Sequence, residues 1–139
     1  MKSLINKTVI ILGMLALNVG MVSPSYAGID DSAKEVGKMV GRYNVTRNGM
    51  CKPFSTPYMN KYVKANDKFF AGRSWTAKNR YKRGKEEGSA EWNFVMAKIK
   101  KQDPATFANP AKLKQRCDQM DSDAKVQYEQ IAMLGIYNS

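Results

Sequence analysis

The stretch from Asn109 to Gly135, NPAKLKQRCDQMDSDAKVQYEQIAMLG, decides the fold that the sequence predicts. Asn109 is a preferred N-cap residue, and Pro110 stands in the first turn, where a backbone N–H would be unpaired anyway. Apolar residues then recur every three or four positions and form one stripe: Leu113, Cys117, Met120, Ala124, Tyr128, Ile131 and Leu134. Three polar residues lie off this stripe: Lys114, Asp121 and Lys125. We therefore expect one core helix, which Gly135 can end, with a cysteine on its buried face.

The first 27 residues have the pattern of a secretory signal peptide. A basic segment up to Lys7 precedes the apolar run Thr8–Val22, and small residues stand at the −3 and −1 positions of a cleavage site after Ala27. The alternative is an uncleaved membrane anchor, but the run has 15 residues and contains Asn18, whereas a spanning helix needs about 20 apolar residues. We expect residues 28–139 to form a single helical domain that is periplasmic or secreted.

The two cysteines, Cys51 and Cys117, both lie in the part predicted to be exported. In an oxidising compartment, such a pair in a small domain most simply forms a disulfide. A metal site is the alternative, but it needs two more soft ligands and the sequence contains no histidine. Cross-linking across the 65 intervening residues stabilises a fold by about 4 kcal/mol on the chain-entropy estimate.

A first helix is expected after Ser32, because Ser32 and Glu35 have the spacing of a capping box. Its apolar stripe is short: Ala33, Val36, Val40 and Tyr43. Gly49 is the expected end of this helix, which places Cys51 in the connection that follows. Asn44 begins a glycosylation sequence, but its position inside a helix argues against modification.

A second helix is expected from Thr56-Pro57, a cap followed by proline, to about Gly72. Its apolar residues gather on one side: Met59, Tyr62, Val63, Phe69 and Phe70. Its lysines lie almost opposite: Lys61, Lys64 and Lys68. This separation is typical of a core helix with a solvated outer face, and it also suits a cationic face that contacts a membrane or a polymer.

One long helix is expected over residues 74–101, because seven positions stay in phase through it: Ala77, Tyr81, Gly84, Gly88, Trp92, Val95 and Ile99. Glycines inside a helix cost about 1 kcal/mol each relative to alanine, so we expect a neighbouring helix to approach closely there. The alternative is a break at Gly88 with Ser89 as the next cap. The segment from Asp103 to Pro110 then connects to the last helix, with Phe107 as a plug against the core.

Basic residues are abundant, with 23 Lys and Arg against 12 Asp and Glu in the whole chain. Without Lys2 and Lys7, 21 basic residues remain against the same 12 acids, a net charge of +9 that favours anionic partners. The densest run is Lys78, Arg80, Lys82, Arg83 and Lys85. It does not indicate nucleic acid, because these residues point in several directions around a helix, and Glu86 and Glu87 can pair with Lys82 and Arg83 at i,i+4.

Few catalytic arrangements fit this composition. Without histidine, Ser–His and Cys–His nucleophile pairs and histidine-based zinc sites are excluded. Asp118, Asp121 and Asp123 lack the spacing of a calcium loop and are expected to be surface charges, so no metal or other cofactor is predicted. Glu91, next to Trp92, is the one carboxylate for which desolvation by a neighbour suggests general acid chemistry on cell-wall sugars.

The sequence thus predicts an all-α fold, an irregular bundle of about four helices with one disulfide. The leading functional hypothesis is a non-enzymatic binding protein of the bacterial envelope, with an inhibitor, immunity-type or chaperone-like role. It would engage an acidic protein or an anionic envelope polymer through a basic face: Lys61, Lys64, Lys68, Arg80 and Arg83. The alternatives are a secreted effector that acts on anionic membranes or cell wall through a cationic helix, with peripheral membrane contact, and a carboxylate-dependent wall hydrolase.

Overall fold

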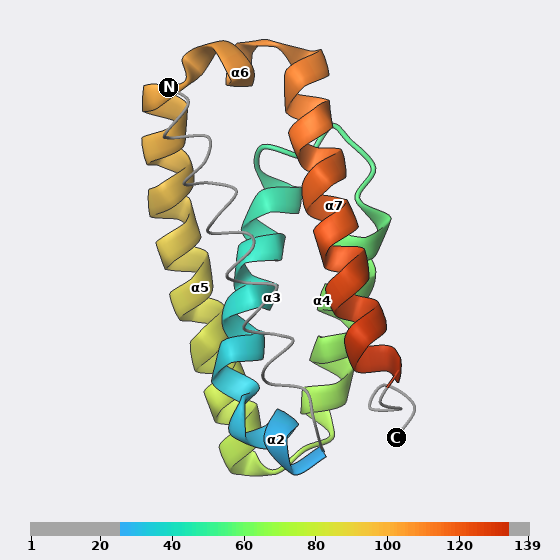
Figure 1. Ribbon diagram of the computed structural model, residues 1–139. Coiled ribbons are helices and arrows are strands. Elements are labelled where there is room, and N and C mark those ends of the chain that lie inside the picture. The colour runs from blue at the N-terminus through green and yellow to red at the C-terminus, as the bar shows by residue number, and fades with distance from the viewer. Residues whose placement is uncertain (1–25, 134–139) are drawn as a thin grey trace.

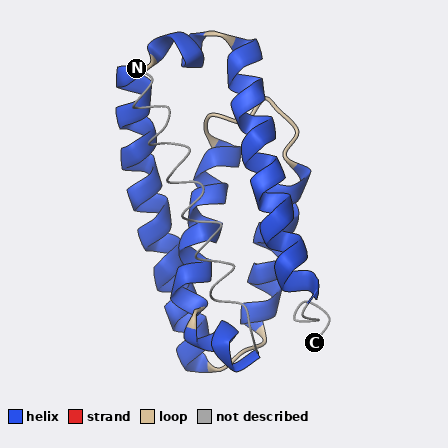
Figure 2. Cartoon of the chain, viewed as in Figure 1, coloured by secondary structure: helices blue, strands red, loops and turns tan. Residues whose placement is uncertain are grey.

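The computed structural model describes residues 26–133, and its regular structure is entirely helical (Figure 2). The six helices of this part of the chain are α2 (Tyr26–Asp31), α3 (Ala33–Asn48), α4 (Pro57–Ala71), α5 (Trp75–Gln102), α6 (Pro104–Ala108) and α7 (Pro110–Met133). The predicted all-α bundle is confirmed, and so is the continuity of the long helix through Gly88. Helix α2 was not expected from the sequence. The predicted leader up to Ser25, Leu134 on the apolar stripe and the helix end at Gly135 lie outside the described residues.

The long helices are arranged side by side in the order α5, α3, α4, α7 (Figure 1). Helix α3 packs between α5 and α4, and α4 packs on α7. Helices α5 and α7 extend past the C-terminal end of α3, where the short α6 joins them (Figure 1). None of the helices between Tyr26 and Met133 combines the length and the apolar character that crossing a membrane requires.

Helices α3 and α5 meet through glycines on both sides of their contact. A Cβ added to Gly84 or Gly88 would lie 2.1 Å from the backbone oxygen of Lys34 or Lys38, respectively. A Cβ on Gly37 or Gly41 of α3 would lie 2.3 Å from a backbone oxygen of α5. The expected close approach is therefore confirmed, and the pair Gly37 and Gly41 is the part that sequence reasoning did not identify.

Helix α7 is attached to the rest of the fold by the predicted disulfide between Cys51 and Cys117, whose Cα atoms are 5.7 Å apart. A second link is the carboxylate of Asp121, which accepts hydrogen bonds from the backbone N–H groups of Tyr58 and Met59 at 3.0 and 2.9 Å. These are donors of the first turn of α4, which no earlier backbone carbonyl can satisfy. Asp121 therefore caps α4 from another helix and is buried, and the prediction of a surface charge was wrong.

Two of the predicted helix caps differ from the structure. Ser32 makes no side-chain cap hydrogen bond, because α2 ends directly before it and the backbone continues into α3 almost without a break. Thr56 makes none either, since Asp121 takes its place. The Asn109 cap is confirmed, with its Oδ1 accepting from the N–H groups of Ala111 and Lys112.

The core is formed by the predicted apolar stripes together with buried polar pairs. Trp92 donates its indole N–H to Thr46 at 2.8 Å, and the Tyr43 hydroxyl donates to Gln127 at 2.8 Å. Burial raises the pKa of Tyr43 far above its ordinary value, so this phenol stays a neutral donor. The expected core positions Leu113 and Phe107 are only half-buried, because α3 ends before it can cover them.

Candidate functional site

The five predicted basic residues lie on two separate surfaces. Lys61, Lys64 and Lys68 are all exposed on α4, on the side opposite its buried apolar residues. Lys61 lies on the side of α4 that faces α7, because its ammonium and that of Lys125 lie 5.0 and 5.3 Å from the centre of the same Tyr58 ring. The buried residues of α4 include the whole predicted apolar face, so this helix has no free apolar side.

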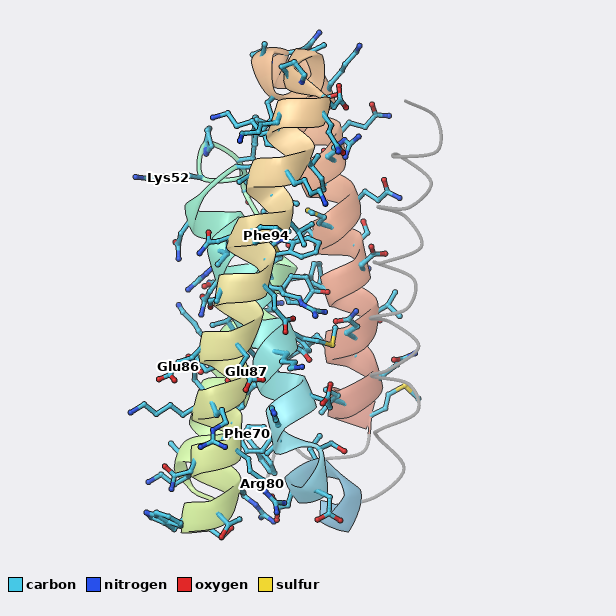
Figure 3. The ribbon with its side chains drawn as sticks, turned by 90° about the vertical axis from the view of Figure 1, so that its left-hand side faces the viewer. Lys52, Phe70, Arg80, Glu86, Glu87 and Phe94 are labelled. Atoms are coloured by element: carbon cyan, nitrogen blue, oxygen red, sulfur yellow. A yellow bond between two sulfur atoms is a disulfide. The ribbon has the colours of Figure 1, made fainter. Side chains whose placement is uncertain are left out.

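Arg80 and Arg83 instead line a groove of about 760 Å³ where α5 runs beside α2 and the start of α3. Figure 3 shows Arg80 next to α2, at the end of the bundle where α5 begins. The basic residues of the groove are Lys34, Arg80, Lys82 and Arg83. Its acidic residues are Asp31, Glu35 and Glu86, and its other lining residues are Trp75, Thr76 and Asn79. We call this the α2–α3–α5 groove.

Local sequence explains how α5 presents this set. Ser74 caps the helix by accepting from the N–H of Ala77, so Trp75 is its first residue. Trp75 cannot turn into the core, which Ala77 and Tyr81 occupy, and its side chain is 79% exposed. Arg80 and Arg83, three residues apart, then follow on one face of the helix.

The ion pairs next to the groove leave its arginines uncommitted. The carboxylate of Glu87 lies 3.3 Å from the ammonium of Lys34 on α3. Glu87 therefore pairs between helices, and not with Arg83 as the sequence had predicted. Among residues 26–133, no carboxylate oxygen lies within 4.0 Å of the guanidinium nitrogens of Arg80 or Arg83. Two guanidinium groups are thus available to an incoming partner.

Glu91 does not have the environment on which its catalytic hypothesis depends. Its side chain is 51% exposed and its carboxylate lies 3.2 Å from Arg42 and 3.9 Å from Lys38. Trp92 is buried and donates to Thr46, so it does not cover its neighbour. The carboxylate of Glu91 is an ion-pair partner that helps to hold α3 against α5.

The three aspartates of α7 diverge. Asp118 pairs with Lys114 at 2.7 Å on the surface, whereas Asp121 faces α4. Burial raises the pKa of Asp121 and of Asp123 above the ordinary aspartate value, and for Asp121 the two backbone hydrogen bonds oppose this shift. Within the described part of the chain, no group of three or more Cys, Asp or Glu side chains is placed to hold a metal ion.

Sequence reasoning missed Trp75 and the α2–α3 side of the groove. Asp31, Lys34 and Glu35 reach Arg80 only because the glycines bring α3 and α5 together, which no local pattern reports. A tryptophan directly after a helix cap and out of phase with the apolar stripe was the available signal for Trp75.

No family model, no curated protein and no solved structure matches the chain.

Proposed function

We propose that this chain is a small exported binding protein of the bacterial envelope, without catalytic activity, that engages an acidic protein through the α2–α3–α5 groove. The observation that carries the proposal is the combination of the two uncommitted guanidinium groups of Arg80 and Arg83 with the exposed indole of Trp75. Tryptophan and arginine are the residues most enriched among those that dominate protein–protein binding energy. The role is that of an inhibitor, an immunity-type protein or a chaperone-like protein.

The charge pattern of the groove favours a folded protein over a uniformly anionic polymer. Three carboxylates, of Asp31, Glu35 and Glu86, line the groove among its four basic residues. A polymer with the same charge at every repeat would place some of its anions against these carboxylates. A protein surface can instead match the pattern, with acids opposite the arginines and donors opposite the carboxylates.

Export is supported by two features. The first is the leader-like pattern of residues 1–27. The second is the disulfide between Cys51 and Cys117, a bond that persists in oxidising compartments such as the bacterial periplasm.

The test is quantitative partner capture from an envelope extract with two groove variants and one control variant. Replacing Arg80 and Arg83 by Glu, or Trp75 by Ala, is expected to lower partner recovery at least tenfold. The matched control reverses Lys61, Lys64 and Lys68 on α4 and is expected to retain the partner. Equal recovery by the wild type and by the Arg80→Glu, Arg83→Glu variant refutes the groove, and loss confined to the lysine variant moves the interface to α4.

Two further assays separate the two other hypotheses. An effector on anionic membranes would release dye from anionic vesicles, which a binding protein leaves intact. Since the apolar face of α4 is buried, such activity would need this helix to leave the core. A wall hydrolase would lose its activity in Glu91→Gln, whereas we expect the wild type to release no soluble fragments from purified cell wall.

A further inference from the structure

A second concave site lies at the other end of the molecule, under α6. It is a pocket of about 470 Å³ whose walls come from α3, the loop after α3, α5, α6 and α7. Five large apolar side chains line it, and all five are half-buried: Val45, Met50, Met96, Phe107 and Leu113. None of the basic residues of the proposed protein-binding groove takes part, so the pocket is independent of that proposal.

The pocket exists because the helices differ in length. Helix α3 ends at Asn48, while α5 and α7 continue beyond it and lack a helix between them (Figure 1). The five-residue α6 spans their ends and is held by Asp103, which accepts from the Thr106 hydroxyl at 2.7 Å and lies 3.5 Å from Arg116. Apolar residues that would pack on a longer α3 therefore line an open space instead.

Lysines are the most frequent charged residues at this end of the molecule. Lys100 lies in the wall of the pocket, and Lys52 extends from the neighbouring loop away from the bundle (Figure 3). Further exposed lysines stand on the same end of α5 and at the start of α7: Lys98, Lys101 and Lys112. Of the acids nearby, Asp103 is engaged by Thr106 and Arg116, and Asp118 is paired with Lys114. Of the described residues that line this largely apolar pocket, Lys100 is the one that carries a charge.

We propose that this pocket binds the hydrocarbon chain of a medium-chain fatty acid, with the carboxylate at Lys100. The volume falls within the 300–1,000 Å³ range typical of small-molecule sites and does not suit a docked helix. Two of the five apolar side chains are methionines, whose flexible thioethers adapt to a flexible ligand. The carboxylate complements the charge of Lys100, and the methylene chain complements Val45, Phe107 and Leu113.

The test is calorimetric titration with saturated fatty acids of 8 to 12 carbons, each below its micelle concentration. Burial of each further methylene is expected to tighten binding about fourfold until the pocket is filled. Dodecanol, with the same chain and no charge, is expected to bind about tenfold more weakly than dodecanoate. A cationic amphiphile of equal chain length is expected to bind more weakly still.

Two variants of exposed alanines on α5 locate the site. Ala97 lines the pocket, and Ala97→Trp is expected to fill it and to weaken dodecanoate binding at least tenfold. Ala90 is equally exposed but lies outside the pocket, so Ala90→Trp is the matched control that retains binding. Because both alanines are exposed, both variants are expected to keep the wild-type unfolding midpoint.

Three results overturn the proposal. The first is the absence of saturable binding of dodecanoate to the folded wild type. The second is equal binding by Ala97→Trp and Ala90→Trp, which would place the chain elsewhere. The third is a preference for a lysophospholipid or for the cationic amphiphile over dodecanoate, which would show that the site does not select a fatty-acid carboxylate.

Discussion

The α3–α5 pair and the α4–α7 pair are held together by different means. Between α3 and α5 the backbones themselves touch, because four glycines remove the side chains that would keep them apart. Helices α4 and α7 contact through side chains and are linked by the capping carboxylate of Asp121, while the disulfide of Cys117 ties α7 to the connection between α3 and α4.

This difference predicts different sensitivities. A backbone-to-backbone contact has no side chain that can move aside, so any added atom forces the helices apart. A covalent cross-link acts chiefly by restricting the unfolded chain, so its loss weakens the fold without a local clash. The α3–α5 contact should therefore respond to added volume, and the attachment of α7 should respond to removed links.

The largest expected effect comes from removing the cross-link. The Cys51→Ala, Cys117→Ala double variant is expected to lose about 4 kcal/mol of unfolding free energy, since the bond closes a loop with a sequence separation of 66. Urea unfolding followed by circular dichroism measures this. Reduction of the wild type is the control and should reproduce most of the loss. A double variant as stable as the oxidised wild type would show that packing and the Asp121 hydrogen bonds hold α7 without the cross-link.

The next effect concerns the glycine contact. Gly88→Ala is expected to destabilise the protein by about 1–3 kcal/mol, because the new Cβ would meet the Lys38 backbone at 2.1 Å. The matched control is Gly72→Ala, where the nearest atom is 3.7 Å away and φ is −93°.

Thermal and urea unfolding should separate the two glycine variants, with destabilisation only in Gly88→Ala. Gly72→Ala is expected to be neutral or to stabilise by up to about 1 kcal/mol, because alanine restricts the unfolded chain. Stabilisation by Gly88→Ala as well would contradict the backbone contact between α3 and α5.

The comparison also explains how far the sequence could predict this fold. Apolar periodicity, the Asn109 cap and the two cysteines are local signals, and they correctly predicted the four long helices, the start of α7 and the disulfide, but not the short α2 and α6. Asp121 was placed off the apolar stripe, as a surface charge, although it stands four residues after Cys117 on the same side of the helix. Only the first turn of α4, 62 residues away in the chain, makes its burial favourable.

The candidate site was less predictable for the same reason. Arg80 and Arg83 could be identified as basic residues, but their grouping with Asp31 and Glu35 depends on the crossing of α3 and α5. Lys61, Lys64 and Lys68 were assigned to the same face because net charge carries no information on position. The pocket under α6 depends on where α3 ends relative to α5 and α7, which is a difference in length between segments far apart in sequence.

A smaller effect is expected at the Asp121 cap. Asp121→Ala removes the acceptor of two first-turn donors of α4 and is expected to cost about 1–2 kcal/mol, as loss of a conventional cap does. Asp118→Ala is the control on the same helix, where loss of an exposed i,i+4 pair costs about 0.5 kcal/mol or less. Equal losses in the two variants would mean that the cap does not stabilise α4.

The smallest effect is a pH dependence with opposite signs at the two buried aspartates. Burial raises the pKa of Asp121, so the folded protein takes up this proton more readily than the unfolded chain. Its contribution to stability should therefore become more favourable as pH falls from neutral toward about 4. The hydrogen bond from the Thr106 hydroxyl lowers the pKa of Asp103. The stability that the Asp103 carboxylate contributes is therefore present above its pKa in the unfolded chain, and it is lost as pH falls through its pKa in the folded protein.

Urea unfolding of the wild type, Asp121→Asn and Asp103→Asn between pH 7 and pH 3 measures both signs. On acidification, the wild type should gain relative to Asp121→Asn and should lose relative to Asp103→Asn. The same sign in both variants would mean that general charge repulsion, and not the local environment of each carboxylate, sets the acid response. Opposite signs would show that the α4–α7 link tolerates acid while the α6 bridge loosens, since Asp103 holds α6 through Thr106.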